Sequence, residues 1–576
     1  MNDSVRILGL VGATHDSGIA VLAGGEIDLV IEEERLKREK RTRNFPRLSL
    51  MAALGADGRG LQDIDVMVTP WDVRRLRRSF SRAVFSHLPF SLSLLSERSH
   101  SPQRSEIAIL DHYLIRKLRK CFASARLPPL VCVGHHESHA ATFFVSPFEE
   151  ANILVMDGYG DDAASSLYSG KGNVLERRWH SQFFNSLGMV YTVVTGYLGF
   201  EPLEGEGKVM ALAAYGDDAC VERFRDLIRL TSDGRYQINM DYFAFDTFGE
   251  LRPFKKKFFE VFGPARLPGE PLEDRHRAIA YALQHVTEET ILHMVRHITR
   301  TSPSRNLVIA GGVALNCVVN ARILQETDIE RLWVPPAASD AGAPLGACLW
   351  HHHQTLGAKR TFELVRADYG LTYADEDIVR ALRAANLKWE LLDDATLFSR
   401  VAHDLANGKV AGWFQGRFEM GPRALGNRSI LADPRNAEMR DTLNAKIKKR
   451  ESFRPFAPAV LAERAADYFE IAQPDPFMTL APRVHPAKRA EIAAAVHVDG
   501  TARLQTVDAD AQPRFHALIS AFGRLTGVPV LLNTSFNRKE PIVASPQDAV
   551  SCFLRTDMDV LVLGNHYAVR AMPPAG

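Results

Sequence analysis

The sequence has almost no excess charge of either sign and few cysteines. Its 576 residues contain 70 Lys and Arg against 69 Asp and Glu, a formal net charge of +1. Dedicated nucleic-acid-binding proteins usually have a strongly positive balance, so any basic site here must be local. The six cysteines are scattered and form no CxxC pair. Neither a disulfide framework nor a zinc knuckle is therefore indicated, and a reducing, cytoplasmic location is expected.

Long apolar runs are also missing. No run approaches the roughly 18 apolar residues of a membrane-spanning helix. The N-terminus, MNDSVRILGLVGATHDSGIAVL, carries an early acid and several glycines, which fits a secretory signal poorly. A composition that is 46% hydrophobic and 24% charged is typical of a folded globular protein. We expect no membrane partner and no nucleic-acid partner, and the oligomeric state stays open.

A strand, a glycine-rich turn and a second strand are predicted over residues 5–31. A shift of 146 residues places NILVMDGYGDDAASSLYSGKGN over this hairpin. Chance and true duplication explain the few identities about equally well. The aligned identities are Ile7 with Ile153, Leu8 with Leu154, Gly12 with Gly158, Asp16 with Asp162 and Gly24 with Gly170.

Strands alternate with helices along the rest of the chain, which predicts α/β architecture. Residues 272–300 are expected to form one amphipathic, core-packing helix. A strand over 306–310 runs into Gly311-Gly312 and a helix, a pattern that lets backbone approach a phosphate or ribose. The pattern loosens over 356–375, and helical periodicity resumes over 376–407. We therefore predict domains at 1–355 and 376–576, joined by a linker.

Two histidines and two aspartates offer ligands for a transition metal. His135 and His139 have the HxxxH spacing that places both imidazoles on one helical face. With 20 histidines, about one such pair arises by chance, so a structural pair is the alternative. Asp157 ends the repeated strand and Asp340 follows a strand at 331–334, where ligands of α/β sheets gather. This set suits iron, zinc or manganese better than calcium or magnesium.

The second half contains a dense group of basic residues among glycines. QGRFEMGPRALGNRS carries Arg417, Arg423 and Arg428, and KIKKRESFRPF follows with Lys448 and Arg454. Such cations beside accessible backbone amides match a phosphate-rich small ligand, whereas the alternative is a solvated basic turn. Residues 74–120 are basic too, and we interpret them as a solvated helix face in preference to a partner surface.

Eight motifs, taken together, resemble one family. The O-carbamoyltransferases include the tobramycin, nodulation-factor, cephem and ansamycin carbamoyltransferases. The resemblance implies an N-terminal actin-like domain (duplicated ribonuclease H-like) of the tRNA threonylcarbamoyltransferase type and a C-terminal YrdC-like α/β domain. The motifs, which span almost the whole chain in this order, are HHESHAATFF, VMDGYGDD, GEGKVMALAAYG, AGGVALN, VPPAASDAGAPLGA, QGRFEMGPRALGNRS, RESFRPFAPAV and LLNTSFN.

This resemblance implies a two-step reaction. The YrdC-like half would convert carbamoyl phosphate and ATP, with Mg²⁺, into carbamoyl adenylate. The N-terminal half would pass the carbamoyl group to a hydroxyl of a small-molecule, natural-product acceptor. Cationic side chains would neutralise the phosphates and the developing pyrophosphate. The positions that match carbamoyl phosphate and ATP sites are Arg423, Lys448, Arg454, Arg503, Asn533 and Ser535.

The resemblance also implies roles in the N-terminal half. The four metal-ligand candidates match an iron site, where a metal acts as a Lewis acid. His15 matches the residue that would accept the acceptor's proton, whereas a turn histidine bonded to Asp16 is the alternative. Ala13 replaces an aspartate of the aminoglycoside enzyme, so a cationic aminoglycoside acceptor is disfavoured. Positions matched near the adenylate are Lys40, Gly188, Lys208, Gly312 and Asn316.

Two other interpretations stay open. A tRNA or another macromolecule is an alternative acceptor, supported only by the basic segment 74–120, and salt-sensitive tRNA binding would favour it. The N-terminal half is alternatively a nucleotide-dependent scaffold with no chemistry. Hydrogenase-maturation carbamoyltransferases have both domain types as well, but they carry CxxC zinc fingers and this sequence has none.

Overall fold

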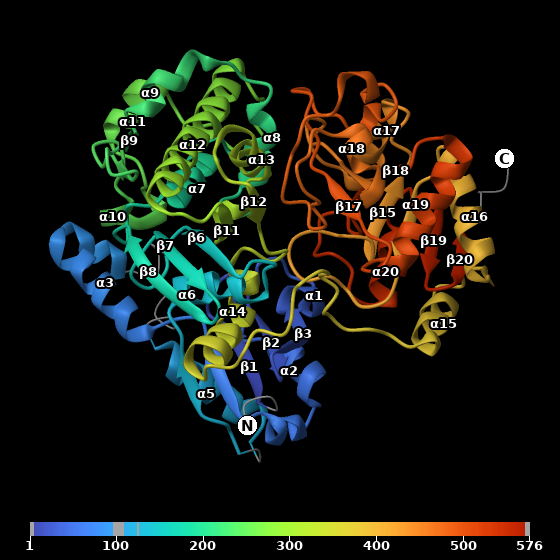
Figure 1. Cartoon of the computed structure of the whole chain (residues 1–576), viewed down its shortest axis with the longest axis horizontal. Helices are drawn as coiled ribbons and strands as arrows, with labels where there is room; N and C mark the ends of the chain where they lie inside the picture. Colours follow the sequence, from blue (N-terminus) through green and yellow to red (C-terminus); the bar gives the residue numbers. More distant parts are fainter. Residues whose placement is uncertain (1–4, 96–108, 124–125, 571–576) are drawn as a thin grey trace. The chain divides into compact units, whose positions relative to one another are not determined.

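The computed structural model describes residues 5–95, 109–123 and 126–570, which form two compact units that each mix helices and strands (Figure 1). Unit 1 comprises Met1–Glu33 and Arg41–Leu364, and unit 2 comprises Glu34–Lys40 and Val365–Gly576. The boundary between Leu364 and Val365 falls inside the segment 356–375, which was predicted to be a linker. Residues 34–40, by contrast, belong to unit 2, which otherwise consists of the second half of the chain. Among the described residues, no helix has both the length and the apolarity to cross a membrane.

Unit 1 contains two five-stranded sheets with the same topology. Each consists of an antiparallel three-stranded meander whose first strand pairs in parallel with a fourth strand, and that strand pairs in parallel with a fifth. The first sheet has the order β3-β2-β1-β4-β5 and the second β8-β7-β6-β11-β12. The strands are β1 (Arg6–Val11), β2 (Gly18–Ala23), β3 (Glu26–Glu32), β4 (Val66–Thr69), β5 (Leu130–Cys132), β6 (Glu150–Met156), β7 (Ser165–Lys171), β8 (Val174–His180), β11 (Asn306–Ala310) and β12 (Arg331–Trp333).

The strand register repeats at the spacing found in the sequence. Ile7 lies opposite Leu22 in the first sheet, and Ile153 lies opposite Tyr168 in the second, each partner 146 residues further on. An irregularity in the pairing of the second and third strands recurs at the same place in both meanders. Because order, register and irregularity recur together, the structure confirms the hairpin repeat as a structural duplication.

Short helices around these sheets position the polar residues of unit 1. The expected long helix is confirmed as α12 (Asp274–Thr301), and α14 (Ala343–Leu349) packs against β1, β2 and α6 (His135–Ala140). A side chain at Gly346 would overlap the backbone of Ser138, so α14 and α6 touch through their backbones. Other helices of unit 1 are α2 (Arg47–Leu54), α3 (Val73–Ser86), α5 (Leu110–Cys121), α7 (Leu187–Tyr197), α8 (Glu206–Ala213), α9 (Val221–Arg225), α10 (Phe245–Phe248), α11 (Lys256–Phe262) and α13 (Cys317–Glu326), and β9 (Ile228–Leu230) pairs with β10 (Tyr236–Ile238).

Unit 2 is a mixed eight-stranded sheet between two layers of helices. Helices α16 (Asp394–Ala406) and α19 (Pro513–Thr526) share one apolar cluster with one face of the sheet, and α15 (Asp375–Ala384) and α20 (Pro546–Leu554) share another with the opposite face. The periodicity expected over 376–407 thus comprises two helices with a strand between them. The sheet order is β13 (Trp389–Leu391), β20 (His566–Val569), β19 (Val560–Leu563), β14 (Ala411–Phe414), β15 (Arg428–Ala432), β18 (Val530–Ser535), β16 (Ala457–Leu461) and β17 (Gln505–Val507).

Candidate functional site

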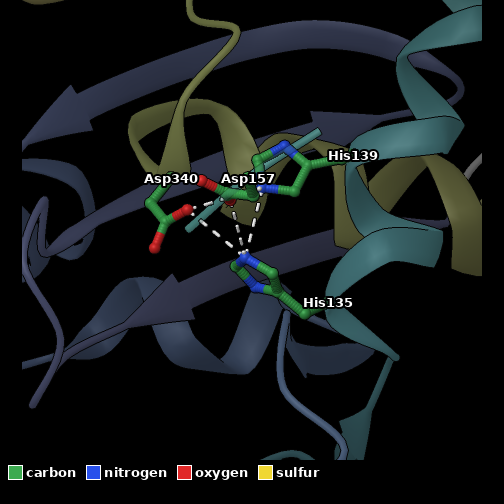
Figure 2. A group of neighbouring side chains, drawn as sticks. All are labelled: His135, His139, Asp157 and Asp340. Carbon is green, nitrogen blue, oxygen red and sulfur yellow. Dashed lines mark hydrogen bonds and ion pairs between the residues drawn. The ribbon is translucent and has the colours of Figure 1, made fainter. Parts of the chain in front are cut away.

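Two histidines and two aspartates of unit 1 point toward one another (Figure 2). His135 and His139 lie one turn apart on α6, Asp157 follows β6, and Asp340 begins the turn that leads into α14. His135 Nε2 lies 3.3 Å from a carboxylate oxygen of each aspartate, and His139 Nε2 lies 3.2 and 3.4 Å from the same two oxygens. One ligand atom from each residue falls within 4.8 Å of all the others.

Neighbouring residues fix the orientation of His135. Its Nδ1 lies 3.1 Å from the carbonyl oxygen of Pro70, and its ring stacks on Trp71 with 4.1 Å between centroids. When Nδ1 donates its proton to that carbonyl, Nε2 presents a lone pair to the cluster. The backbone N–H of His135 donates to the buried Asp161, whose pKa is raised to about 7 by burial and by nearby Glu137.

Backbone N–H groups fix the orientation of Asp157. Its Oδ1 accepts hydrogen bonds from the backbone N–H groups of Gly158, at 2.8 Å, and Gly312, at 3.3 Å. Its Oδ2 therefore faces the histidines. Gly188, the second residue of α7, lies against the backbone of Asp157, because a Cβ there would be 2.6 Å from the Asp157 carbonyl oxygen. Both glycines predicted near the adenylate thus adjoin the His–Asp cluster.

Electrostatics in the cluster favour a bound cation. Burial opposes charge on both histidines, but the carboxylates of Asp340 and Asp157 outweigh it and raise the pKa of His135 well above its usual value, and that of His139 as well. The histidines in turn outweigh burial and lower the pKa of both aspartates. Two imidazole nitrogens and two carboxylate oxygens at these distances fit a divalent iron, zinc or manganese ion.

His15 lies beside this cluster, in the loop between β1 and β2. Its Nε2 is 3.8 Å from Asp340 Oδ2 and its Nδ1 is 3.3 Å from Asp16 Oδ2. The contact with Asp16 is the one expected of a turn histidine, and the other ring nitrogen faces Asp340. Ala13 and Asp16 have left-handed backbone, with φ of 63° and 62°. Such strain persists only where surrounding contacts hold it, here including the 2.9 Å bond from Ala13 N–H to the Arg43 carbonyl.

The other residues predicted near the adenylate lie on separate elements. Asn316 caps α13 and exchanges two 3.0 Å amide hydrogen bonds with Gln284 of α12. Lys208 lies on α8 with its Nζ 5.8 Å from the ring centroid of Phe200. Lys40 belongs to unit 2. The structure thus places Gly188 and Gly312 at Asp157 within unit 1, and it assigns Lys40 to unit 2.

Lys448 lies at the centre of a second polar site, in unit 2. The side chain is buried, and its Nζ donates to the backbone carbonyls of Ser535 and Asn537, each at 2.8 Å, and approaches Asn537 Oδ1 at 2.6 Å and Ser535 Oγ at 3.2 Å. Four oxygens therefore surround an ammonium that has three protons. Lys448 organises the loop after β18 as well as supplying charge.

Further cations surround Lys448. Burial, followed by Arg450, Arg454 and Lys40, lowers the pKa of Lys448 well below its usual value. Burial, followed by Arg454 and Arg503, lowers the pKa of Arg450, and burial, followed by Arg503, lowers that of Arg454. Positive groups that disfavour one another's charge around a buried ammonium are stabilised when an anion binds. This cation cluster, defined as Lys40, Lys448, Arg450, Arg454 and Arg503, suits a polyphosphate ligand.

Asn533 contributes an acceptor to unit 2's candidate site. Its Nδ2 donates to Gln505 Oε1 at 2.8 Å and to the Ala424 carbonyl at 3.2 Å. Within the described part of the chain, its buried Oδ1 has no hydrogen-bond partner. A buried acceptor without a donor is costly, so a ligand N–H would relieve it.

Two arginines of the glycine-rich loop hold the loop itself. Arg428 is fully buried, stacks 3.5 Å over the ring centroid of Phe414 and donates to the Gly416 carbonyl at 3.0 Å. Arg417 donates to the carbonyls of Gly370 and Tyr369. Both side chains therefore hold the loop through backbone carbonyls. Arg423 lies between them in the sequence, on the same loop.

Sequence reasoning missed the residues that support each site. Pro70 and Trp71 directly follow β4, so the rule that ligands gather at the carboxyl ends of strands could have found them. Asp161 is the counterpart of His15 at the 146-residue spacing, a second available signal. No sequence signal pointed to Gln505, because it meets Asn533 only where β17 and β18 pair with the same strand, β16.

Comparisons with known proteins show the family of this chain. A family profile described as Carbamoyltransferase N-terminus matches residues 6–349, and one described as Carbamoyltransferase C-terminus matches residues 402–570. The chain belongs to the carbamoyltransferase family. As a member, it is an enzyme of mixed α/β fold.

Curated relatives of this carbamoyltransferase cover most of its length. Uncharacterized protein sll1178 of Synechocystis is 41% identical over 99% of this chain and 97% of its own. Nodulation protein NolNO of Sinorhizobium fredii is 37% identical, covering 96% of this chain and 78% of its own. Full-length HypF in a phosphate- and nucleotide-bound form overlaps 60% of this chain and 46% of its own, with 11% identity and a TM-score of 0.34. The assignment rests on the profiles and the curated relatives.

Proposed function

We propose that this carbamoyltransferase is an ATP-dependent O-carbamoyltransferase that modifies a hydroxyl of a small-molecule acceptor. The observation that carries the proposal is that one chain holds a buried His–Asp cluster in unit 1 and, in unit 2, a cation cluster around the buried Lys448. Unit 1 is proposed to be the actin-like transfer domain, over 1–355, and unit 2 the YrdC-like domain, over 376–576. The recurring sheet topology of unit 1 supports its assignment.

The cation cluster would form the activated anhydride. Water releases inorganic phosphate from carbamoyl phosphate and leaves carbamate, whose oxygen attacks the α-phosphorus of ATP and displaces pyrophosphate. Arg454, Arg503 and Lys448 would neutralise the charge that develops on the leaving pyrophosphate, with Mg²⁺ as its counter-ion. Arg423 and Ser535 are the further ligand-binding candidates. The unpartnered Oδ1 of Asn533 would accept the carbamoyl N–H.

The His–Asp cluster would support transfer. The four side chains would hold a divalent metal such as Fe²⁺, which supplies Lewis-acid polarisation when bound. The acceptor oxygen forms a bond to the carbamoyl carbon as the bond to AMP breaks, and the hydroxyl proton passes to His15. Asp16 would hold the His15 ring in place through Nδ1. Gly188, Gly312 and Asn316 would line the adenylate site, with Lys208 as a further contact.

The acceptor is proposed to be a natural-product alcohol. Support comes from relatives named nodulation proteins and from Ala13, which offers no charge to a cationic aminoglycoside. The arginines at 74, 77, 78 and 82 on α3 are exposed, which matches a solvated face, and part of the segment 74–120 lies outside the described residues. No second observation favours a tRNA acceptor.

Mass spectrometry of the reaction mixture tests the proposal. Purified protein, ATP, Mg²⁺, Fe²⁺ and carbamoyl phosphate are incubated with candidate alcohols, and omission of carbamoyl phosphate is the control. We expect one alcohol to gain the mass of a single carbamoyl group while ATP is converted to AMP and pyrophosphate. A protein that consumes no ATP in the presence of carbamoyl phosphate would contradict the proposal and favour a scaffold.

A further inference from the structure

A short segment from the N-terminal end of the chain belongs to unit 2. The helix α1 spans Glu33–Lys37, and residues 34–40 lie within unit 2, after which the chain returns to unit 1 at Arg41. Lys40 ends this segment with an exposed side chain, and its charge contributes to lowering the pKa of Lys448, after burial and the neighbouring arginines. One cation of the cluster is therefore delivered by a segment that must be held in place.

Arg38 holds the segment with every edge of its guanidinium. Nη1 donates to the carbonyl oxygen of Ile542 at 2.7 Å, Nη2 donates to that of Pro541 at 2.6 Å, and Nε lies 3.4 Å from an Asp548 carboxylate oxygen. Lysine has one donor centre and cannot reproduce this fork. These three contacts attach Arg38 to one loop and to the first turn of α20.

A second contact and the backbone support this attachment. Arg35 is buried and donates to the Gly421 carbonyl at 2.5 Å. Arg38 and Arg41 both have left-handed backbone, with φ of 62° and 48°, on either side of Lys40. Side chains rarely adopt this conformation unless other contacts fix it, so the direction of the chain at Lys40 depends on the anchored arginines.

The loop that receives Arg38 is the loop that organises Lys448. The Oδ1 of Asn537 accepts a hydrogen bond from Lys448 Nζ, and its Nδ2 donates to the Glu540 carbonyl at 2.6 Å. The next residue, Pro541, is one of those that accept hydrogen bonds from Arg38. Arg38 thus attaches residues 34–40 to a loop that already contacts the central cation. Loss of Arg38 would release one side of the cation cluster.

We infer that Arg38 is a positioning residue for the adenylate-forming site: it fastens residues 34–40 to the loop at 535–548 and so holds Lys40 in the cation cluster. The inference rests on the proposed function for the identity of the anion, but not for the attachment.

A double-mutant cycle on the full-length protein tests this inference. Binding of inorganic pyrophosphate and of ATP is measured by calorimetry for wild type, Arg38→Ala, Lys40→Ala and the double variant. If Arg38 acts through Lys40, each single change weakens binding about tenfold and the double change also about tenfold. Arg570→Ala is the matched control, because Arg570 donates to the Phe553 and Met558 carbonyls near the other end of α20; it should leave affinity unchanged.

Amide hydrogen exchange supplies the readout that a general structural role would not reproduce. Arg38→Ala should raise exchange at residues 34–41 and leave α16 and α19 protected, whereas Lys40→Ala should leave exchange as in wild type. The inference would be overturned if the double variant bound about a hundredfold more weakly than wild type, because the two losses would then be independent. Unchanged amide exchange at residues 34–41 in Arg38→Ala would also overturn it. So would a wild-type protein that binds neither anion. Failure of carbamoyl transfer with this cycle intact would contradict the proposed function alone.

Discussion

At the residue scale, side chains of one type have different roles according to their contacts. In the sequence HHESH, His135 and His139 face the two aspartates, whereas His136 Nδ1 lies 2.7 Å from Ser166 Oγ. The i, i+4 spacing predicted which histidines share a face. It could not predict the orientation of His135, because Pro70 and Trp71 are distant in sequence.

Matched asparagine substitutions test the metal ligands. His139→Asn keeps an atom near Nδ1 but removes Nε2, so we expect stoichiometric binding of Fe²⁺ or Zn²⁺ to be lost, with at least a tenfold drop in affinity. His136→Asn makes the same change on the neighbouring ring, which does not face the aspartates, and should retain the metal. Elemental analysis and calorimetry measure both. Equal metal content in the two variants would contradict the assignment.

A buried histidine outside both sites predicts a pH effect on stability. His353 lies in the π-helical turn Trp350–Thr355, and burial lowers its pKa to about 4 from 6.5. Because the pKa of His353 is lower in the folded than in the unfolded protein, the neutral ring contributes its full stability above pH 6.5. That contribution is lost as the pH falls toward the folded-state pKa, since the unfolded chain then binds a proton that the folded protein does not. Between pH 6.5 and 4 this group should lower the unfolding free energy by up to about 1.4 kcal/mol per pH unit.

Chemical denaturation across that pH range measures the effect. His353→Gln, which has no proton to gain, should flatten this part of the profile. A His353→Gln profile parallel to that of wild type would show that His353 titrates normally.

At the element scale, the repeated meander explains why the polar residues of unit 1 meet. Strands β1 and β6 end at the glycine-containing loops that carry His15 and Asp157, and α14 brings Asp340 to α6. The sequence predicted the long helix, the strand at 306–310 and the spacing of the repeat, because these depend on local periodicity. It did not predict that residues 34–40 join unit 2, since Arg38 meets its partners more than 500 residues later.

The approach of α7 to Asp157 gives a prediction about one glycine. In Gly188→Ala the new Cβ would lie 2.6 Å from the Asp157 carbonyl oxygen, so that backbone must shift. We expect about tenfold weaker metal binding and about 1–3 kcal/mol lower stability. Gly207→Ala in α8 is the matched control: its Cβ meets nothing within 4 Å, and it should gain up to about 1 kcal/mol with metal affinity unchanged. Wild-type metal affinity in Gly188→Ala would contradict the packing argument.

At the scale of the whole molecule, one chain combines a site that attracts anions with a site that suits a cation. The net charge of +1 hides both, because each is a local excess within a balanced composition. The sequence predicted the residues of the His–Asp cluster and the basic character of the second site. It did not distinguish an arginine that supports a loop, such as Arg428, from an arginine of the cation cluster, such as Arg454. The two roles differ in burial and in contacts with backbone carbonyls, and neither property is visible in the sequence.

The division of labour between the sites is the central claim, and pyrophosphate release from ATP in the presence of carbamoyl phosphate tests it most directly. The variants are His139→Asn and Lys448→Met, each checked for wild-type thermal unfolding. We predict that His139→Asn releases pyrophosphate at close to the wild-type rate but carbamoylates no acceptor, and that Lys448→Met loses both by about a hundredfold or more. Loss of pyrophosphate release in His139→Asn as complete as in Lys448→Met would contradict the account.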